Sequence, residues 1–248
     1  MQETIIEINQ LTKQFRNADR PSLDAIDLTI LNGEKFGVFG PNGAGKTTLI
    51  SILCSILEPT SGDVVYTLNG KQESINNILT TVGFVPQEYA FYPELTPIQN
   101  LSYFGALYSI PKKELSQKIK ELLITLGLDH VGDKKVNTFS GGMKRRINLA
   151  IGLINNPRIL FLDEPTVGVD VQSKVAIISL LEELNKNGTT IIYTSHHLKE
   201  AEDFCDRIAL LENGKIIALD KLENLILANN VSNLEDLLIK LTGKKLRD

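Results

Sequence analysis

One short stretch of the chain has the residue types that bind phosphate. Residues 40–48 are Gly-Pro-Asn-Gly-Ala-Gly-Lys-Thr-Thr and fit the phosphate-loop pattern G-x-x-x-x-G-K-[ST]. The apolar residues 35–39 before it predict a buried strand, and residues 49–54 after it predict a helix. Backbone N–H groups in such a loop, together with the positive end of the helix dipole, attract phosphate charge. The stretch therefore predicts a nucleotide site.

The residues of this loop have different expected roles in nucleotide binding. Lys46 would reach the β- and γ-phosphates, and the Thr47 hydroxyl would bind Mg²⁺. Gly43 and Gly45 would allow the backbone conformations and the close approach that a Cβ atom hinders. We assign nucleotide binding to Gly40, Asn42, Gly43, Gly45, Lys46, Thr47 and Thr48.

A pair of carboxylates follows a strongly apolar segment. Residues 159–162 are Ile-Leu-Phe-Leu, which is typical of a strand buried on both faces of a parallel sheet, and Asp163 and Glu164 come next. A carboxylate at such a strand end can hold the Mg²⁺ that bridges two phosphates, and we give that role to Asp163. Glu164 would then polarise the attacking water. The pair predicts phosphoryl transfer to water.

A second helix start also favours anions. Ser140 can cap a helix, and Gly141 and Gly142 would leave its first N–H groups exposed. The core face of this helix is predicted to be Ile147, Ala150, Ile151 and Ile154. A nucleotide site within one chain needs only one such helix start, so from these residues alone a purely structural cap is the favoured interpretation of the second one.

The remaining pattern predicts an α/β fold: a P-loop NTPase core with a mostly parallel sheet, an N-terminal antiparallel β part and an inserted α-helical subdomain. Asn32-Gly33 and Asn213-Gly214 are hairpin turn sequences, and Asn69-Gly70 predicts a turn. Residues 97–107 and 112–126 have helical periodicity, and Ser232 with Glu235 predicts a capping box for a last helix. We expect one domain over 1–248, with a core of residues 1–89 and 156–220, a helical subdomain of 90–155 and a C-terminal helical extension of 221–248.

Composition limits the function classes. The 248 residues carry a net charge of −4, which gives no general attraction to nucleic acid. The short basic run Lys144-Arg145-Arg146 is expected to be a solvated face or to meet an acidic neighbour, not a nucleic-acid patch. No apolar run approaches the ~20 residues that span a bilayer. Any membrane role is therefore expected to go through another protein.

Taken together, these motifs resemble the nucleotide-binding subunit of an ABC transporter over nearly the whole chain. Residues 40–47 match its Walker A motif, residues 139–143 its signature motif, and residues 159–164 its Walker B motif with the catalytic glutamate. Gln87 stands at the position of the Q-loop glutamine, residues 168–170 at the D-loop and His196 at the switch histidine. Phe15 matches the aromatic residue that stacks on adenine.

The resemblance implies a mechanism with two chains and two cofactors, ATP and Mg²⁺. Two ATPase subunits, identical or a paired heterodimer, would close head to tail, and Ser140, Gly141 and Gly142 of one would contact the ATP of the other. The implied catalytic residues are Glu164, His196 and Gln87, and the implied metal-binding residues are Thr47, Gln87 and Asp163. A separate transmembrane permease would dock around residues 87–105, which implies the cytoplasmic face of the cell membrane. No nucleic-acid partner is expected.

The sequence departs from the usual family motifs at three places, and these differences indicate a subgroup of the family. Phe139 and Met143 replace the usual Leu and Gln of the signature, and Gly168-Val169-Asp170 replaces Ala-Leu-Asp. These variants resemble a subgroup of exporter ATPases for drugs, polysaccharides, lipids or antibiotic peptides. The alternatives are a soluble ABC-type ATPase acting on ribosomes or DNA, an ATP-binding regulatory module without turnover, and an importer ATPase.

Overall fold

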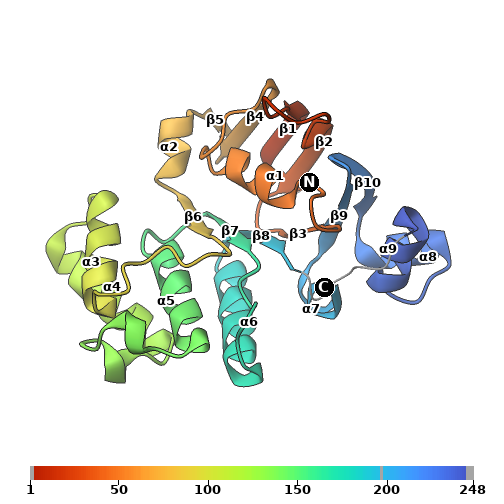
Figure 1. Ribbon diagram of the computed structural model, residues 1–248. Helices are drawn as coiled ribbons and strands as arrows, with labels where there is room; N and C mark the ends of the chain where they lie inside the picture. Colours follow the sequence, from red (N-terminus) through yellow and green to blue (C-terminus); the bar gives the residue numbers. More distant parts are fainter. Residues whose placement is uncertain (1–2, 196–197, 244–248) are drawn as a thin grey trace. The chain divides into compact units, whose positions relative to one another are not determined.

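The computed structural model describes residues 3–195 and 198–243, which form two compact units. Unit 1 comprises residues 1–79 and 190–248, and unit 2 comprises residues 80–189 (Figure 1). Unit 2 is thus one continuous piece of chain, whereas unit 1 is assembled from two pieces.

The first sheet of unit 1 is antiparallel, as the sequence predicts. Its strand order is β2-β1-β4-β5, with β1 at Thr4–Lys13, β2 at Leu23–Leu31, β4 at Ser61–Leu68 and β5 at Lys71–Glu73. Ile6 lies opposite Ile30 on one side and Tyr66 on the other. The β4–β5 hairpin turns at Asn69 and Gly70, whose φ angles of 51° and 73° are those of a tight hairpin turn.

The other strands of unit 1 have the order β10-β9-β3-β8. Strand β3 at Lys35–Phe39 runs parallel to β8 at Thr190–Thr194 and to β9 at Arg207–Glu212, and β10 at Lys215–Asp220 pairs antiparallel with β9. The predicted hairpin at Asn213-Gly214 is confirmed, with φ angles of 49° and 78°. Strand β3 leads directly into the phosphate loop and then into α1 at Lys46–Leu53.

The hairpin predicted at Asn32-Gly33 is wrong. Strand β2 belongs to the antiparallel sheet and β3 to the other one, so this turn carries the chain between sheets. The turn is closed by the Glu34 N–H, which donates to Leu31 O at 3.2 Å, and the Gly33 N–H donates to Thr190 Oγ1 at 2.9 Å. The physical reason is β3 itself: Phe36, Val38 and Phe39 are fully buried, and such a strand needs parallel partners on both sides.

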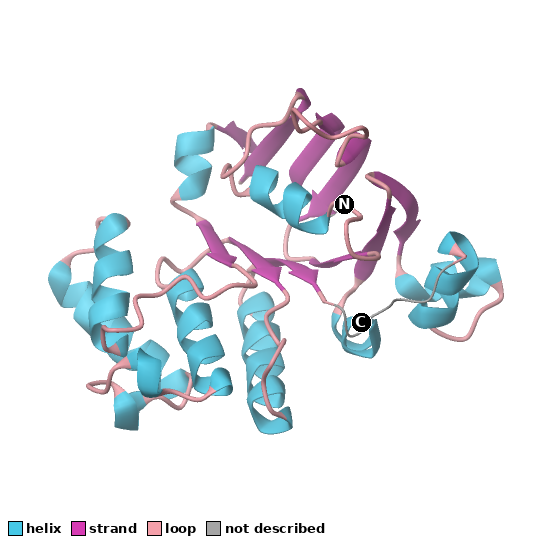
Figure 2. Ribbon diagram, in the orientation of Figure 1, coloured by secondary structure: helices cyan, strands magenta, loops and turns pink. Residues whose placement is uncertain are grey.

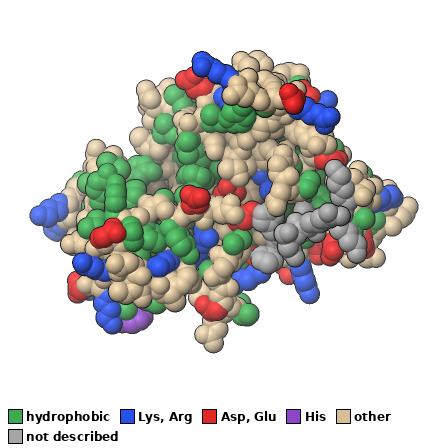
Figure 3. Space-filling view, viewed as in Figure 1, with side chains coloured by type: hydrophobic (Ala, Val, Ile, Leu, Met, Phe, Trp, Pro, Cys, Tyr) green, Lys and Arg blue, Asp and Glu red, His purple; other side chains and the backbone are tan. Residues whose placement is uncertain are grey.

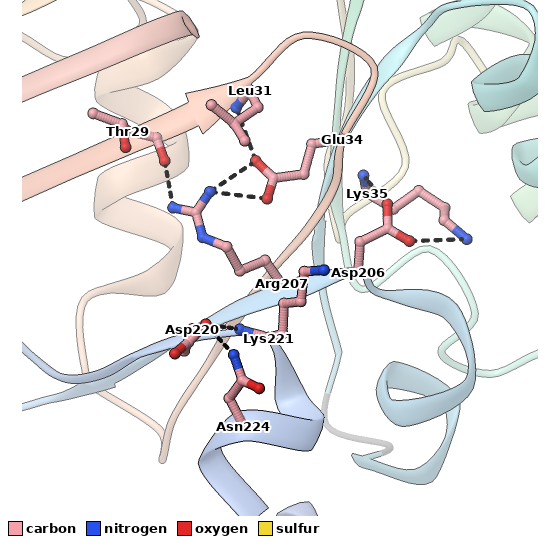
Figure 4. Close-up of polar contacts among 9 residues, drawn as sticks. All are labelled: Thr29, Leu31, Glu34, Lys35, Asp206, Arg207, Asp220, Lys221 and Asn224. Carbon is pink, nitrogen blue, oxygen red and sulfur yellow. Dashed lines mark hydrogen bonds and ion pairs between the residues drawn. The ribbon is translucent and has the colours of Figure 1, made fainter. Parts of the chain in front are cut away.

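A partly buried ion pair joins β9 to the turn before β3 (Figure 4). The Arg207 guanidinium donates to both oxygens of Glu34 at 2.9 and 3.2 Å and to Thr29 O at 2.7 Å. The Glu34 carboxylate also accepts from the Leu31 N–H at 2.8 Å, and the Arg207 guanidinium lies 5.1 Å from the centroid of the Phe36 ring. Burial raises the pKa of Glu34, and the Leu31 hydrogen bond and Arg207 only partly offset this.

Short helices complete unit 1: α2 at Ile75–Leu79, α7 at Leu198–Phe204, α8 at Leu222–Asn229 and α9 at Leu234–Thr242. The predicted cap of the last helix is off by one residue. Asn233, not Ser232, caps α9, and its Oδ1 accepts from the Asp236 N–H at 2.8 Å. Asn233 directly precedes the first helical residue, so its side chain reaches the N–H three residues on.

Unit 2 combines four main helices with two parallel strands (Figure 2). Strand β6 at Val82–Val85 pairs with β7 at Ile159–Asp163, and Val82 lies opposite Ile159. The helices are α3 at Pro97–Leu107, α4 at Lys112–Thr125, α5 at Gly141–Leu153 and α6 at Val171–Lys186, with short 3₁₀ turns at Asp129–Val131 and Val136–Thr138. Both helices predicted between 97 and 126 are confirmed. No helix among the described residues has the length and apolarity needed to cross a bilayer.

Helix α5 approaches β6 backbone to backbone. A Cβ atom on Gly83 would collide with Gly152 O, and one on Gly152 would lie 2.5 Å from Val85 Cγ2. The two glycines therefore let α5 pack directly on the strand. This packing brings the middle of α5 next to residues 86–90, the segment that leaves β6.

Candidate active site

The phosphate loop of unit 1 is ordered around its own lysine. The Lys46 ammonium donates to Gly40 O at 2.8 Å and to Pro41 O at 3.1 Å, and the residue is only 6% exposed. Helix α1 begins at Lys46 after Gly45, whose φ is 111°, and no side chain caps its first turn. That turn also has no acidic side chain, so a cation and a helix N-terminus meet at the loop. The loop fits an anionic phosphate chain.

A neighbouring loop lies against the start of α1. Ser22 Oγ is 2.9 Å from Thr48 Oγ1, and a Cβ atom on Gly45 would lie 2.5 Å from Ser22 O. The segment 14–22 that ends at Ser22 carries Phe15, the predicted adenine platform. Phe15 is 44% exposed, and the Lys13 ammonium lies 5.4 Å from its ring centroid. An exposed aromatic face of this kind can stack on a base.

In unit 2 the predicted carboxylates and Gln87 come together. Asp163 and Glu164 are 3% and 4% exposed at the end of β7. Gln87 Nε2 donates to Glu164 Oε2 at 2.9 Å. The φ angle of Glu164 is +52°, in the left-handed region that glutamate seldom adopts. Such strain persists only where the surrounding structure fixes the residue, and it is concentrated at functional sites.

Helix α5 holds the segment that carries Gln87. Asn148, which is 1% exposed, donates to Pro86 O at 3.0 Å and accepts from the Ala90 N–H at 2.9 Å. Sequence reasoning missed Asn148. Asn148 stands between the apolar residues Ile147 and Leu149 in the helix. This pattern could have predicted a buried polar side chain that needs hydrogen-bond partners.

Arg145 is the second residue that sequence reasoning missed. Of the two expectations for the basic run, a solvated face is wrong for Arg145, which is 4% exposed. Its guanidinium donates to Gln87 O at 2.9 Å, to Pro86 O at 3.3 Å and to Val167 O at 3.3 Å, and it lies 5.1 Å from the Tyr89 ring centroid. Burial lowers the pKa of Arg145, while the nearby Tyr89 and Glu164 raise it.

The second anion-favouring helix start has the predicted cap. Ser140 Oγ accepts from the Met143 N–H at 3.3 Å, and Ser140 and Gly141 are exposed. Gly142 has a packing role as well, because a Cβ atom there would lie 2.7 Å from Ser173 Oγ and 3.0 Å from Asp170 Oδ2. Asp170 caps α6, and its hydrogen bonds from Ser173 hold the pKa of its carboxyl below the usual value.

The other predicted site residues divide between the two units. Gly40, Asn42, Gly43, Gly45, Lys46, Thr47, Thr48 and Phe15 lie in unit 1, whereas Gln87, Ser140, Gly141, Gly142, Asp163 and Glu164 lie in unit 2. His196 lies outside the described residues. The oxygen donors proposed for a metal are a hydroxyl, a carboxylate and an amide carbonyl, which is the hard-oxygen chemistry that Mg²⁺ prefers.

Comparison with known proteins identifies the family. The model of the ABC transporter family matches residues 23–167. The linearmycin resistance ATP-binding protein LnrL of Bacillus subtilis is 42% identical over 197 residues, which are 78% of this chain and 62% of that protein. The daunorubicin resistance ATP-binding protein DrrA3 of Streptomyces coeruleorubidus is 36% identical over 218 residues, 88% of this chain and 68% of that protein. The chain thus spans about two thirds of the length of these curated relatives.

Solved structures agree with this match. A dimeric ATP-binding cassette in a post-hydrolysis state, bound to ADP and Pi, has a TM-score of 0.79 at 27% identity and covers 88% of this chain and 99% of its own. An ATP-binding subunit of an ABC transporter has a TM-score of 0.85 at 24% identity, covering 96% of this chain and 99% of its own, and supports the fold. The phosphate loop, the buried Asp-Glu pair and these matches together show that the chain belongs to the ABC transporter family, as an ATP-binding cassette.

Proposed function

We propose that this chain hydrolyses ATP as one of two cassettes that together drive export through a separate transmembrane permease. The observation that carries the proposal is the contact between Gln87 and Glu164 at the end of β7. A buried carboxylate in a strained backbone conformation, hydrogen-bonded to an exposed glutamine, is an arrangement suited to catalysis and costly for mere structure.

The chain's own residues divide the work of hydrolysis. The loop N–H groups and Lys46 bind and orient the phosphates, and the exposed ring of Phe15 stacks on adenine. Glu164 accepts a hydrogen bond from the attacking water and takes up its proton at a carboxylate oxygen, while Gln87 holds that carboxylate in place. Thr47, Asp163 and Gln87 are the residues proposed to hold Mg²⁺, which would neutralise phosphate charge. His196, outside the described residues, is proposed to interact with the γ-phosphate.

We propose that the N-terminus of α5 binds the ATP of the partner cassette. Ser140 and Gly141 are exposed at the N-terminus of α5 and, with Gly142, would bind the γ-phosphate of ATP held by the other subunit. The description of a related cassette as dimeric supports this arrangement. Each ATP then contacts both subunits, so ATP stabilises the closed pair and hydrolysis releases it. The second subunit is an identical chain or a paired one.

The permease is proposed to dock on the segment 87–105, at the cytoplasmic face of the membrane. This segment and the end of α3 expose large apolar and aromatic side chains: Tyr89, Tyr92, Tyr103, Leu107 and Tyr108. Figure 3 shows hydrophobic side chains gathered over α3. Tyr92 packs edge-on against Tyr103 with ring centroids 5.2 Å apart, so this surface is preformed. Exposed aromatic clusters of this kind mark protein–protein interfaces.

The proposed cargo is a drug-like molecule. Relatives are named for resistance to linearmycin, daunorubicin and doxorubicin, and another is named a probable multidrug transporter protein. The same names favour export over the alternative of a soluble ATPase acting on ribosomes or DNA. Recovery of a polytopic membrane protein with this chain from detergent-solubilised native membranes would support the permease, and recovery of ribosomal proteins would support the alternative.

The decisive variant for ATP hydrolysis is Glu164→Gln. We expect it to bind ATP, to lose turnover by about 100-fold or more and to accumulate as a dimer with ATP, because only the proton acceptor is removed. Phosphate release and size-exclusion chromatography with light scattering measure these effects. Glu183→Gln, at an exposed position of α6, is the matched control. Parental turnover in Glu164→Gln would contradict the proposal.

A companion variant tests the phosphate loop. Lys46→Ala is expected to weaken ATP binding at least tenfold, since a cation beside the phosphates is lost. A fluorescent ATP analogue reports binding, and exposed Lys186→Ala serves as the control. Unchanged affinity in Lys46→Ala would show that the phosphates bind elsewhere.

A further inference from the structure

We infer that Arg145 is a positioning residue that keeps Gln87 in register with Glu164. The inference rests on the proposed function, because it assigns a device to that same catalytic pair. Arg145 is the fourth residue after Gly141, one turn into the helix whose start is proposed to bind the partner's ATP. Its hydrogen bonds to described residues go to backbone carbonyls, so it acts through the backbone of others.

The guanidinium joins two separate segments. Its Nη1 donates to Gln87 O at 2.9 Å and to Pro86 O at 3.3 Å, on the segment after β6. Its Nη2 donates to Val167 O at 3.3 Å, on the segment after β7. The Val167 N–H in turn donates to Glu164 O at 3.3 Å, which closes a turn that begins at Glu164. The planar guanidinium of Arg145 therefore fixes the backbone of Gln87 relative to the turn that carries Glu164.

Both ends of the catalytic contact need such support. Gln87 is exposed and lies on a loop, and Glu164 has the strained φ of +52°. A 2.9 Å contact between them survives only if both backbones are held. Small misplacements of catalytic groups cost large factors in rate, so a residue that sets their spacing has a direct effect on turnover.

The chemistry of Arg145 favours orientation over stability. A buried cation is costly, and its strong hydrogen bonds here go to neutral carbonyls. In the part of the chain that the structure describes, its buried Nε has no acceptor. The Tyr89 ring, whose centroid lies 5.1 Å from the guanidinium, helps to hold the guanidinium in place. An apolar side chain of the same length would fill the space with less desolvation, but it would not bridge the two segments.

The test is Arg145→Lys in the full chain, because lysine keeps the charge and loses the planar fork. We expect kcat for ATP to fall about tenfold or more while the KM and the affinity for a fluorescent ATP analogue change less than about twofold. Amide hydrogen exchange should accelerate in residues 86–90 and 164–168. Arg158→Lys makes the same substitution at an exposed position of unit 2 and should leave all three readouts unchanged.

A second step separates positioning from general structure. In a Gln87→Ala background, Arg145→Lys should lower kcat by less than about twofold, because the residue it positions is already gone. Equal losses in both backgrounds would overturn the inference. If Arg145→Lys does not fold, as judged by near-ultraviolet circular dichroism, Arg145→Met replaces it with the same expected results.

Failure of the two proposals would look different. If the parental protein hydrolyses ATP and Arg145→Lys keeps its kcat and its exchange pattern, the inference falls and the proposed function stands. If the parental protein shows no Mg²⁺-dependent hydrolysis, the proposed function falls, and exchange alone decides the inference. Faster exchange in residues 86–90 would then support the positioning role, and unchanged exchange would overturn it.

Discussion

Each of the two units packs an arginine against an aromatic ring, but the two arginines have different hydrogen-bond partners. Arg207 in unit 1 lies 5.1 Å from the Phe36 ring centroid and pairs with the carboxylate of Glu34. Arg145 in unit 2 lies 5.1 Å from the Tyr89 ring centroid and donates to backbone carbonyls. The same side chain thus neutralises a buried charge in one unit and ties two loops together in the other.

The difference teaches how to separate a stabilising arginine from an orienting one. Removing Arg207 would strand a carboxylate whose side chain is only 6% exposed. Removing Arg145 would leave carbonyls that have lost a donor, and Pro86 O would keep its hydrogen bond from Asn148. The first loss is large because an unpaired buried charge remains, and the second is modest because only neutral groups remain.

The largest expected effect on stability is that of Arg207→Met. We expect the free energy of unfolding to fall by about 3 kcal/mol, because Glu34 keeps its burial and loses its cation. Urea denaturation followed by circular dichroism measures the change. The double variant Arg207→Met/Glu34→Leu should recover at least half of the loss, since it removes the stranded charge. A double variant that is no more stable than the single one would break the comparison.

Arg145→Met should cost less stability, about 1 kcal/mol, because the carbonyls that it abandons are neutral. In the same urea titration, Arg207→Met should therefore lose more stability than Arg145→Met. ATP turnover should show the opposite order, with the larger loss in Arg145→Met. Turnover of Arg207→Met, per folded molecule, is expected to stay within about twofold of the parental value. If Arg145→Met destabilises the chain as much as Arg207→Met does, the two arginines have the same role.

A smaller effect is expected from pH, and it is specific to unit 1. The pKa of Glu34 is raised above 4.5 in the folded chain, mainly by burial, so folding favours its protonated form. Its contribution to stability is complete below the unfolded pKa and declines as the pH rises through the folded pKa. The parental protein should therefore lose stability relative to Glu34→Gln over the pH interval that begins at about 4.5 and ends at the raised pKa of the folded chain. A relative gain over that interval would contradict the assigned cause.

The smallest effect is expected from Tyr89→Leu, which removes the ring beside Arg145. Tyr89 is 41% exposed, so the lost contact should cost only about 0.5 kcal/mol of unfolding free energy. The matched change on the exposed surface of the same unit is Tyr108→Leu. Because Tyr89 supports the orienting arginine, its loss should slow turnover more than the control does. Equal turnover in the two variants would show that the ring plays no part in holding the guanidinium.

The sequence predicted best the features that are encoded locally. The bounds of α3, the hairpin at Asn213-Gly214 and the carboxylates at the end of β7 all follow from patterns within a few residues. The turn at Asn32-Gly33 was predicted wrongly because its local preference is compatible with two outcomes, and the burial of β3 decides between them.

The support for the candidate site could not be predicted, for the same physical reason. Arg145 and Asn148 contact residues 86–90, about sixty positions earlier in the chain. A charged residue on an amphipathic helix is normally solvated, and no local pattern reveals that two glycines bring α5 against β6. The strained φ of Glu164 is likewise a result of tertiary contacts, because local preference disfavours it.

The interrupted course of unit 1 has a consequence for the chain as it leaves the ribosome. Strand β3 finds its parallel neighbours only after all of unit 2 has been made, since Lys35 pairs with Ile191 and Phe36 with Arg207. Unit 2 is continuous and can collapse as soon as it emerges. The growing polypeptide therefore completes the unit that carries Gln87 and Glu164 before the strand that leads into the phosphate loop has paired with its parallel neighbours.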